Sequence, residues 1–136
     1  MDFMKSLFVA ASGLKAQSGR MRVIAENIAN ADSTARTPGG DPYRRRVATF
    51  ESVFDNKMQA NKVAIGPVEE DRSAFNLRFN PSHPAADATG YVKMPNVDRL
   101  VEAVDMREAQ RSYEANLNVI TSTRTMLART LDILNN

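Results

Sequence analysis

The sequence predicts a mainly α protein with a small β insertion (α+β). Long helices at the two ends are expected to pair as a coiled-coil-like layer, with a short antiparallel β region between them. Two observations support this prediction. Apolar residues recur at heptad spacing over the first thirty residues and again over the last forty. Between them lie stretches of β-branched and aromatic residues, one of which alternates with a period of two.

The composition favours helix packing over a thick globular interior. The chain has 136 residues, enough for one domain, and 43% of them are apolar, but only 7% are aromatic and tryptophan is absent. The formal net charge is only +2, so the chain lacks the strongly basic balance of a nucleic-acid-binding protein. The absence of cysteine excludes disulfides and thiolate metal sites.

The first helix is expected to begin after Asp2, a suitable N-cap, and to continue to about Asn30. This length corresponds to about 40 Å. Its heptad pattern has one row of Leu7, Leu14, Met21 and Ile28, and a second row of Phe3, Ala10, Gln17 and Ile24. We expect the assembly seam of this helix to contain Leu7, Leu14, Met21, Ile24 and Ile28.

Gly13 and Gly19 lie inside this helix, where each costs about 1 kcal/mol relative to alanine. Their small size permits close approach of a neighbouring helix, which is one reason to retain them. The alternative is that they are merely tolerated.

The helix is expected to end in a turn over residues 26–34. Asn27, Asn30 and Ser33 suit this role, because asparagine accepts a left-handed backbone and these side chains bond to nearby main chain. No residue of this turn is expected to be catalytic.

Residues 33–45 are predicted to form a loop, since the segment from Pro38 to Pro42 disfavours regular structure. Its glycine pair could cradle a phosphate, but no strand precedes it and no helix pattern begins on it, so a structural loop is favoured. Three arginines follow Tyr43; they could contact nucleic acid, although a solvated or interfacial patch is the better interpretation. The loop residues expected to make contacts are Gly39, Gly40, Asp41, Pro42, Tyr43, Arg44 and Arg45.

Strands are predicted over residues 47–54, 63–68 and 75–80, with the polar run 69–73 as the hairpin turn between the last two. Pro67 favours a sheet edge. This β region is too small to be stable without help from the helices or from neighbouring molecules.

Residues 80–96 are rich in proline, aspartate, alanine and glycine and are expected to be an extended connector. They contain His83, the only histidine of the chain. With no second histidine, no cysteine and no evident base partner, a catalytic or metal-binding role is not expected.

The last helix is expected to begin near Asn96 as its cap and to end at about Leu134. Its seam residues are expected to be Tyr113, Leu117, Ile120, Leu127, Leu131 and Leu134, with Arg124 as a polar member. Val97 and Val104 fall on another row, so the helix should change partners or winding near Asp105. Residues 1–32 and 96–136 would thus form the helical layer, and residues 33–95 the middle region.

The first apolar run contains Lys5 and belongs to the heptad pattern, so it does not resemble a cleavable signal peptide. No segment approaches the eighteen or so apolar residues that are needed to span a bilayer, and membrane insertion is not expected. If the protein works outside the cytoplasm, we expect it to leave by another route.

Residues 25–33 (AENIANADS) resemble the signature that flagellar rod and hook proteins carry at the end of their first helix. Residues 36–45 (RTPGGDPYRR), 90–98 (GYVKMPNVD) and 108–116 (EAQRSYEAN) are more particular. With them the chain is identified as a member of the flagellar basal-body rod proteins. The similarity covers essentially the whole chain except residues 55–80.

This resemblance implies a structural subunit of the bacterial flagellar rod, the periplasmic drive shaft and export channel wall. It implies export through the flagellar type III apparatus and polymerisation in the periplasm with copies of itself and other rod proteins. It also implies that the terminal helices form the inner, channel-lining layer and that the β region makes outer and axial contacts.

Two other classes of function fit the sequence less well. A helical hairpin that binds nucleic acid through Arg20, Arg22 and the arginines at 44–46 requires a basic face, which the nearly balanced charge disfavours. An enzyme is less favoured still, because Asp41 and the acidic run at 69–71 have no convergent partners. No cofactor is expected.

Overall fold

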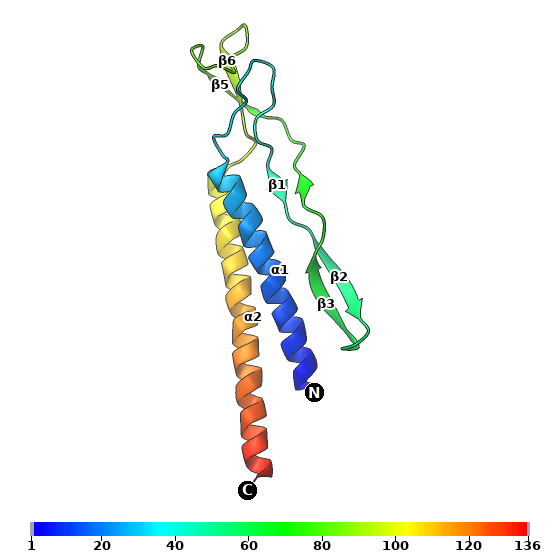
Figure 1. The fold of residues 1–136 in the computed structure, drawn as a ribbon. Helices are drawn as coiled ribbons and strands as arrows, with labels where there is room; N and C mark the ends of the chain where they lie inside the picture. Colours follow the sequence, from blue (N-terminus) through cyan, green and yellow to red (C-terminus); the bar gives the residue numbers. More distant parts are fainter. Residues whose placement is uncertain (1, 136) are drawn as a thin grey trace.

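The computed structural model describes residues 2–135 and shows an elongated molecule dominated by two long antiparallel helices (Figure 1). Helix α1 comprises Phe3–Ala29 and helix α2 comprises Arg99–Leu134. The predicted fold class is therefore confirmed. The free end of α2 extends beyond the start of α1 (Figure 1).

Both helices begin at aspartate caps. The Asp2 carboxylate accepts hydrogen bonds from the backbone N–H of Met4 at 3.0 Å and of Lys5 at 3.3 Å, as the sequence predicts. The expected cap of α2 at Asn96 is wrong, because Asp98 caps this helix by accepting from Leu100 N at 2.9 Å. The Asn96 side chain binds the loop instead.

The middle region consists of three separate two-stranded antiparallel pairs. Strands β1 (Arg46–Val47) and β4 (Glu69–Glu70) pair with each other, as do β2 (Phe50–Asp55) with β3 (Ala60–Ile65) and β5 (Asn76–Phe79) with β6 (Tyr91–Met94).

This pairing corrects two predictions. Residues 69–73 do not form a hairpin turn, because β3 returns along β2 and not along β5. The turn lies at residues 56–59, where the Asp55 carboxylate accepts from Lys57 N and Met58 N and Gln59 adopts a φ of 51°. The connector predicted at 80–96 contains β6, which forms a second hairpin with β5.

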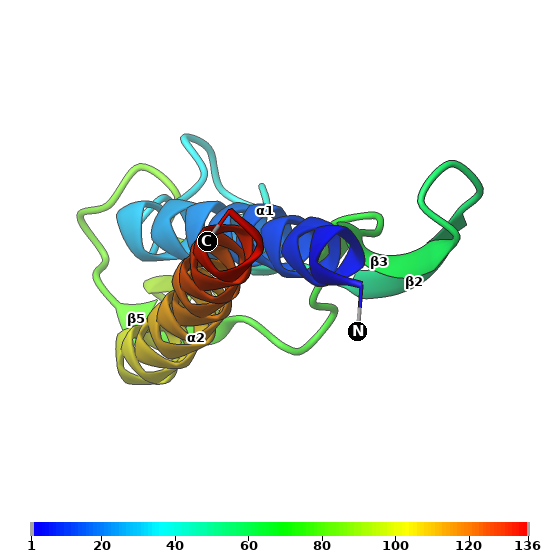
Figure 2. The ribbon, with the colours of Figure 1, turned by 90° about the horizontal axis from the view of Figure 1, so that it is seen from below.

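Helix α1 lies between α2 on one side and the β2–β3 hairpin on the other, as the view from below shows (Figure 2). Its two glycines serve these two contacts. A Cβ at Gly13 would lie 2.8 Å from Asn116 Nδ2 on α2, whereas a Cβ at Gly19 would lie 2.1 Å from Ile65 Cδ1 on β3. Gly13 thus permits the close helix approach that the sequence suggests, and Gly19 permits close approach of a strand.

Candidate assembly surfaces and the polar junction

The end of α1, the loop that follows it and the start of α2 are joined by a partly buried cluster of polar side chains, which we call the polar junction: Asn27, Tyr43, Arg45, Asn96 and Glu102. Glu102 is the centre of the cluster and is 0% exposed. Its carboxylate accepts from Arg45 Nε and, at 3.2 Å, from Asn27 Nδ2. A buried charge is tolerated only when it is paired and hydrogen-bonded, and both conditions are met here.

The Asn27 side chain joins the loop to α1 and uses both of its N–H donors and both acceptor positions of its oxygen in hydrogen bonds. Besides its bond to Glu102, its Nδ2 donates to Arg46 O at 2.8 Å. Its Oδ1 accepts from Tyr43 Oη at 2.8 Å and from Arg46 N at 2.9 Å. Burial at this site raises the pKa of Tyr43. The sequence predicts a turn at Asn27, whereas the structure shows it as a buried residue within α1 that binds a segment 16 to 19 residues away.

Arg45 links α2 to the loop after β4. In addition to Glu102 its guanidinium approaches Asp71 Oδ2 at 3.4 Å and Asp105 Oδ2 at 3.5 Å. Burial alone would lower the pKa of Arg45, but the bonds to Glu102 and Asp71 outweigh it and the pKa is raised. Asn96 completes the junction, because its Oδ1 accepts from Arg45 N at 2.8 Å and its Nδ2 donates to Asp71 O at 2.8 Å.

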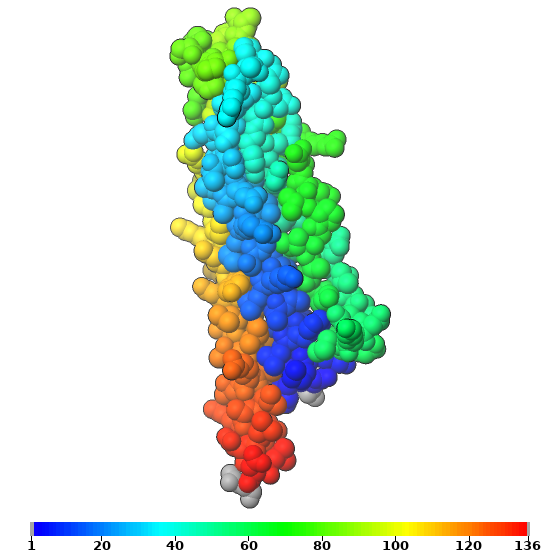
Figure 3. Space-filling model, in the orientation of Figure 1, coloured from blue at the N-terminus to red at the C-terminus, as the bar shows by residue number. Residues whose placement is uncertain are grey.

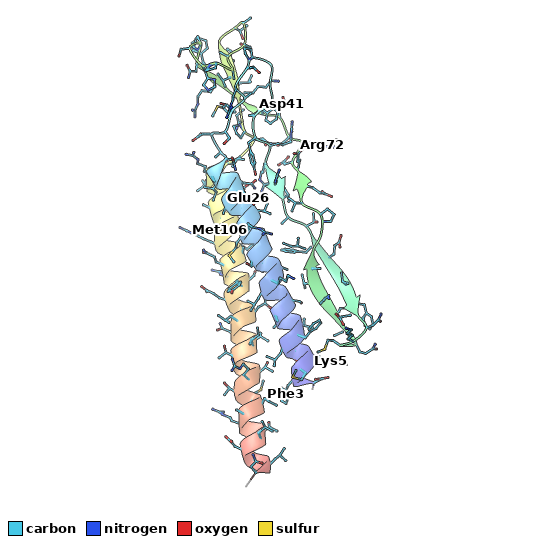
Figure 4. The ribbon with its side chains drawn as sticks, in the orientation of Figure 1. Phe3, Lys5, Glu26, Asp41, Arg72 and Met106 are labelled. Carbon is cyan, nitrogen blue, oxygen red and sulfur yellow. The ribbon has the colours of Figure 1, made fainter. Side chains whose placement is uncertain are left out.

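The turn and the loop are held by local contacts of the predicted residues. Asn30 Nδ2 donates to Glu26 O at 2.9 Å, Ser33 Oγ donates to Asn30 Oδ1 at 3.0 Å, and Ser33 O accepts from Tyr43 N at 2.9 Å. Figure 4 shows Glu26 near the end of α1 from which this loop departs.

Further along the loop, Gly39 adopts a left-handed φ of 81°, which only glycine accepts readily. Gly40 follows it and donates from its backbone N to Thr37 O at 3.3 Å. Asp41, in the loop above the helices (Figure 4), pairs with Lys93 Nζ at 3.6 Å. Pro42 is buried. Together with the junction, these contacts give the loop a structural role within the chain.

The arginines that suggested a nucleic-acid patch are largely engaged in contacts within the chain. Arg44 lies 4.2 Å over the Phe75 ring and donates to Asp71 O at 3.1 Å, and Arg45 belongs to the junction. Arg20 pairs with Glu108 at 3.7 Å. This arrangement weakens the case for a nucleic-acid surface.

The two helices pack in a fixed antiparallel register in which Gly13 lies opposite Asn116 and Asn27 opposite Glu102. On α1, Ile24 is buried, and Leu7, Leu14, Met21 and Ile28 are half-buried. On α2, Tyr113, Ile120 and Leu127 are half-buried, in agreement with one predicted row. The second inward row is Ala109, Asn116 and Thr123, in place of the expected Leu117, Arg124 and Leu131.

The remaining predicted seam residues of α2 are open to solvent in the single chain. Leu117 is 45% exposed, Leu131 is 52% exposed and Leu134 is 75% exposed. Leu131 and Leu134 follow Leu127 by four and seven residues and so extend the α1-facing row, but they lie past the start of α1 (Figure 1). Their role as contacts with a neighbouring subunit stays a prediction.

Large apolar side chains are also exposed on the middle region. They include Phe50, Val53 and Phe54 on β2 and Leu77 and Phe79 on β5. Exposed apolar surface of this extent is typical of proteins that bind other proteins. Among residues 2–135 there is no cluster of three potential metal ligands, and no helix in that range is long and apolar enough to cross a membrane.

Paired terminal helices, a structural polar junction and exposed apolar faces define a protein built for assembly, and comparisons with known proteins agree with this class. Residues 7–36 match the family described as "Flagella basal body rod protein", and residues 88–133 match "Flagellar basal body rod FlgEFG protein C-terminal".

Full-length relatives specify the family. The chain is 52% identical to the flagellar basal-body rod protein FlgC of Agrobacterium fabrum, over 93% of this chain and 91% of the relative. It is 40% identical to FlgC of Bacillus subtilis, over 98% and 99%, and 41% identical to FlgC of Salmonella typhimurium, over 92% of each. The chain belongs to the FlgC family of flagellar basal-body rod proteins, which are structural proteins.

Proposed function

We propose that this chain is a structural subunit of the bacterial flagellar basal-body rod, the periplasmic drive shaft whose wall encloses the export channel. Membership of the FlgC family supports this function. The observation that carries it is the helix pair itself, because α2 is half-exposed along its length and bears large apolar residues that no part of the chain covers. Large exposed apolar patches are typical of surfaces that bind other proteins.

The proposed partners are copies of this chain and other rod proteins of the same axial family. The terminal segments (residues 1–32 and 96–136), which contain α1 and α2, would form the inner layer of the rod, with the predicted seam residues in contacts within and between subunits. The middle region (residues 33–95) would make the outer and axial contacts. Its exposed Phe50, Phe54, Leu77 and Phe79 support this assignment.

We further propose that the chain is exported by the flagellar type III apparatus and orders fully only when it docks. Isolated helices are marginally stable, because most helical stability comes from packing an amphipathic face. Here part of that face remains open to solvent in the single chain. A weakly stable chain is also easily threaded through a narrow channel.

Fractionation and complementation test this function. A strain that lacks the gene should be non-motile and form no complete rod, and a tagged copy should restore motility and co-purify with basal bodies. A tagged copy that restores motility but is absent from purified basal bodies would contradict the proposal. Far-UV circular dichroism over a wide dilution range, with light scattering, tests ordering on assembly: helix content should rise with association, and a dilute monomer with the same helix content as the associated protein would refute that part.

A further inference from the structure

A groove of about 880 Å³ lies between α1 and β3 and is lined by residues of these two elements. In Figure 3, α1 (blue) and the β2–β3 hairpin (green), which form its two sides, lie next to each other. Phe8 and Val63 give the groove apolar walls, and Val63 is 39% exposed. Exposed apolar surface in a hollow of this size is typical of a place where another protein binds.

The floor of the groove is a row of four exposed residues of α1, spaced by four, three and four positions: Ala11, Lys15, Ser18 and Arg22. The row lies on roughly the opposite side of the helix from Gly13, which faces α2, so the chain's own α2 does not cover it. This spacing is that of a coiled-coil seam. Because Ala11 and Ser18 are small, a second helix can approach α1 closely at both positions.

The row carries two cations, Lys15 and Arg22, one heptad apart. Among residues 2–135, neither lies within ion-pair distance of a carboxylate. Lys62, on the β3 side of the groove, already pairs with Asp55 at 3.0 Å. A surface that covers Lys15 and Arg22 removes them from water, so it must supply carboxylates as partners.

The end of α2 from a second copy does not meet this requirement. Residues 119–134 have exposed apolar side chains, but they carry Arg124 and Arg129 against Asp132. This segment would bring a net positive charge to a groove that is already cationic, and like charges in contact disfavour association.

No other helical stretch in the described part of a second copy supplies two unpaired carboxylates one heptad apart. Helix α1 contains a single acid, Glu26. On α2, Glu114 and Asp132 lie more than two heptads apart. The other acids of α2 already pair with Arg45 or Arg20 within the chain: Glu102, Asp105 and Glu108. The charges therefore select a different protein as the occupant.

We propose that the groove between α1 and β3 binds an acidic amphipathic helix of a different protein of the rod. The apolar stripe of this helix packs on Phe8 and Val63. Two of its carboxylates, one heptad apart, lie against Lys15 and Arg22. Flanking ion pairs of this kind set the choice of partner in coiled coils. The proposal rests on the proposed function and adds to it the chemistry of one neighbour.

Zero-length crosslinking in purified basal bodies tests this contact. A carbodiimide joins the Lys15 amine only to a carboxylate in direct contact with it, and mass spectrometry identifies the linked residue. We expect a link from Lys15 to an aspartate or glutamate of another protein. Lys15→Arg is the control, because it keeps the charge but removes the reactive amine and should abolish the link. A link to a second copy of this chain, or no link from Lys15 in basal bodies that contain the chain, would overturn the proposal.

The variant Arg22→Lys adds a second amine and so reports the conformation of the partner. Positions 15 and 22 are about 10 Å apart along α1. A helix spans this distance with about seven residues, whereas an extended strand needs only about three. The two linked acids should therefore be about seven residues apart in the sequence of the partner. A separation of about three residues would show an extended segment and overturn the proposed helix.

Charge reversal gives an independent test. The double variant Lys15→Glu with Arg22→Glu should enter basal bodies roughly tenfold less than the wild type, per exported molecule, because its groove then repels an acidic helix. Lys57→Glu with Arg72→Glu is the matched control, since both residues are exposed, lie outside the groove and change the net charge equally. Equal incorporation of the two double variants would overturn the contact alone. A wild-type tagged copy that is absent from basal bodies would overturn the proposed function as well.

Discussion

Replacing Arg45 by methionine tests the polar junction most directly. Methionine retains an apolar stem of similar length but removes the guanidinium, and Glu102 is then buried with only the Asn27 amide, at 3.2 Å, as a partner. Removing one partner of a buried ion pair costs about 3–5 kcal/mol. Urea unfolding of the full chain, followed by far-UV circular dichroism, should show a midpoint lowered by more than about 1 M, given slopes of roughly 1–3 kcal/mol per M.

Arg46→Met is the control, since Arg46 is half-exposed and approaches Glu26 only at 4.0 Å. This substitution should lower the free energy of unfolding by less than about 1 kcal/mol.

The stability lost by Arg45→Met has two possible sources: the Glu102 carboxylate is left buried without its guanidinium partner, and the packing of the Arg45 side chain changes. The double variant Arg45→Met with Glu102→Leu separates them, because it removes the buried carboxylate but keeps the changed packing. Replacing both partners of a buried pair by apolar residues is often neutral or stabilising. Asp71 and Asp105 also lose their cation, but both are partly exposed and remain hydrated. We expect the double variant to recover most of the stability lost by Arg45→Met. A single variant as stable as the wild type, or a double variant less stable than the single one, would refute this account of the junction.

Three further predictions concern the helices, the histidine and acid stability. Ile24→Asp and Leu127→Asp should each abolish motility, because each places a charge in the helix interface, and a motile strain carrying either variant would contradict the seam assignment. His83→Ala removes the bond from Ala85 N to Nδ1 and should cost about 1 kcal/mol without loss of rod assembly. Impaired assembly of a correctly exported His83→Ala protein would show that this loop makes a subunit contact. The N–H and hydroxyl of Ser73 hold the pKa of Asp71 below its usual value. Its contribution to stability is therefore present at pH values above the usual pKa of an aspartate and is lost as the pH falls through the folded-state pKa; Asp71→Asn should flatten the acid limb of a stability profile.

The helices are predictable because heptad spacing is a strong pattern, and the structure places both helices where that pattern predicts them. Hydrophobicity alone does not predict which second row of α2 faces α1 within the chain, and the place of Leu117 and Leu131 in the assembly seam stays a prediction. The structure places Ala109 and Asn116 inward. The close approach of the two helices at Gly13 leaves room for only small or compact side chains on the row of α2 that contains Asn116. A pattern of apolar residues does not indicate how close the two helices lie.

The strand pairing was mispredicted because its turn lacks the usual asparagine–glycine or aspartate–glycine pair. Residues 56–59 turn through the Asp55 carboxylate and a left-handed Gln59, a residue type that rarely adopts this conformation. The junction was likewise missed, although Glu102 offered a clue: it precedes Ala109 by seven residues and therefore occupies an inward position of α2. A charged residue at such a position implies a buried partner, but sequence alone does not show that Arg45 supplies it.

The distribution of polar and apolar contacts fits a subunit whose helix pair is positioned by bonds within the chain and whose ordering is completed by its neighbours. Directional bonds of Asn27, Arg45 and Glu102 fix the loop and both helix ends in one arrangement within the chain. Apolar contacts are less directional, and along α2 many of the residues that could make them remain exposed. If the exposed rows were covered within the chain, the subunit would be more stable alone but would have less surface for its neighbours. The junction therefore defines the geometry of the helix pair, and we infer that contacts between subunits supply much of the stability of the assembled layer.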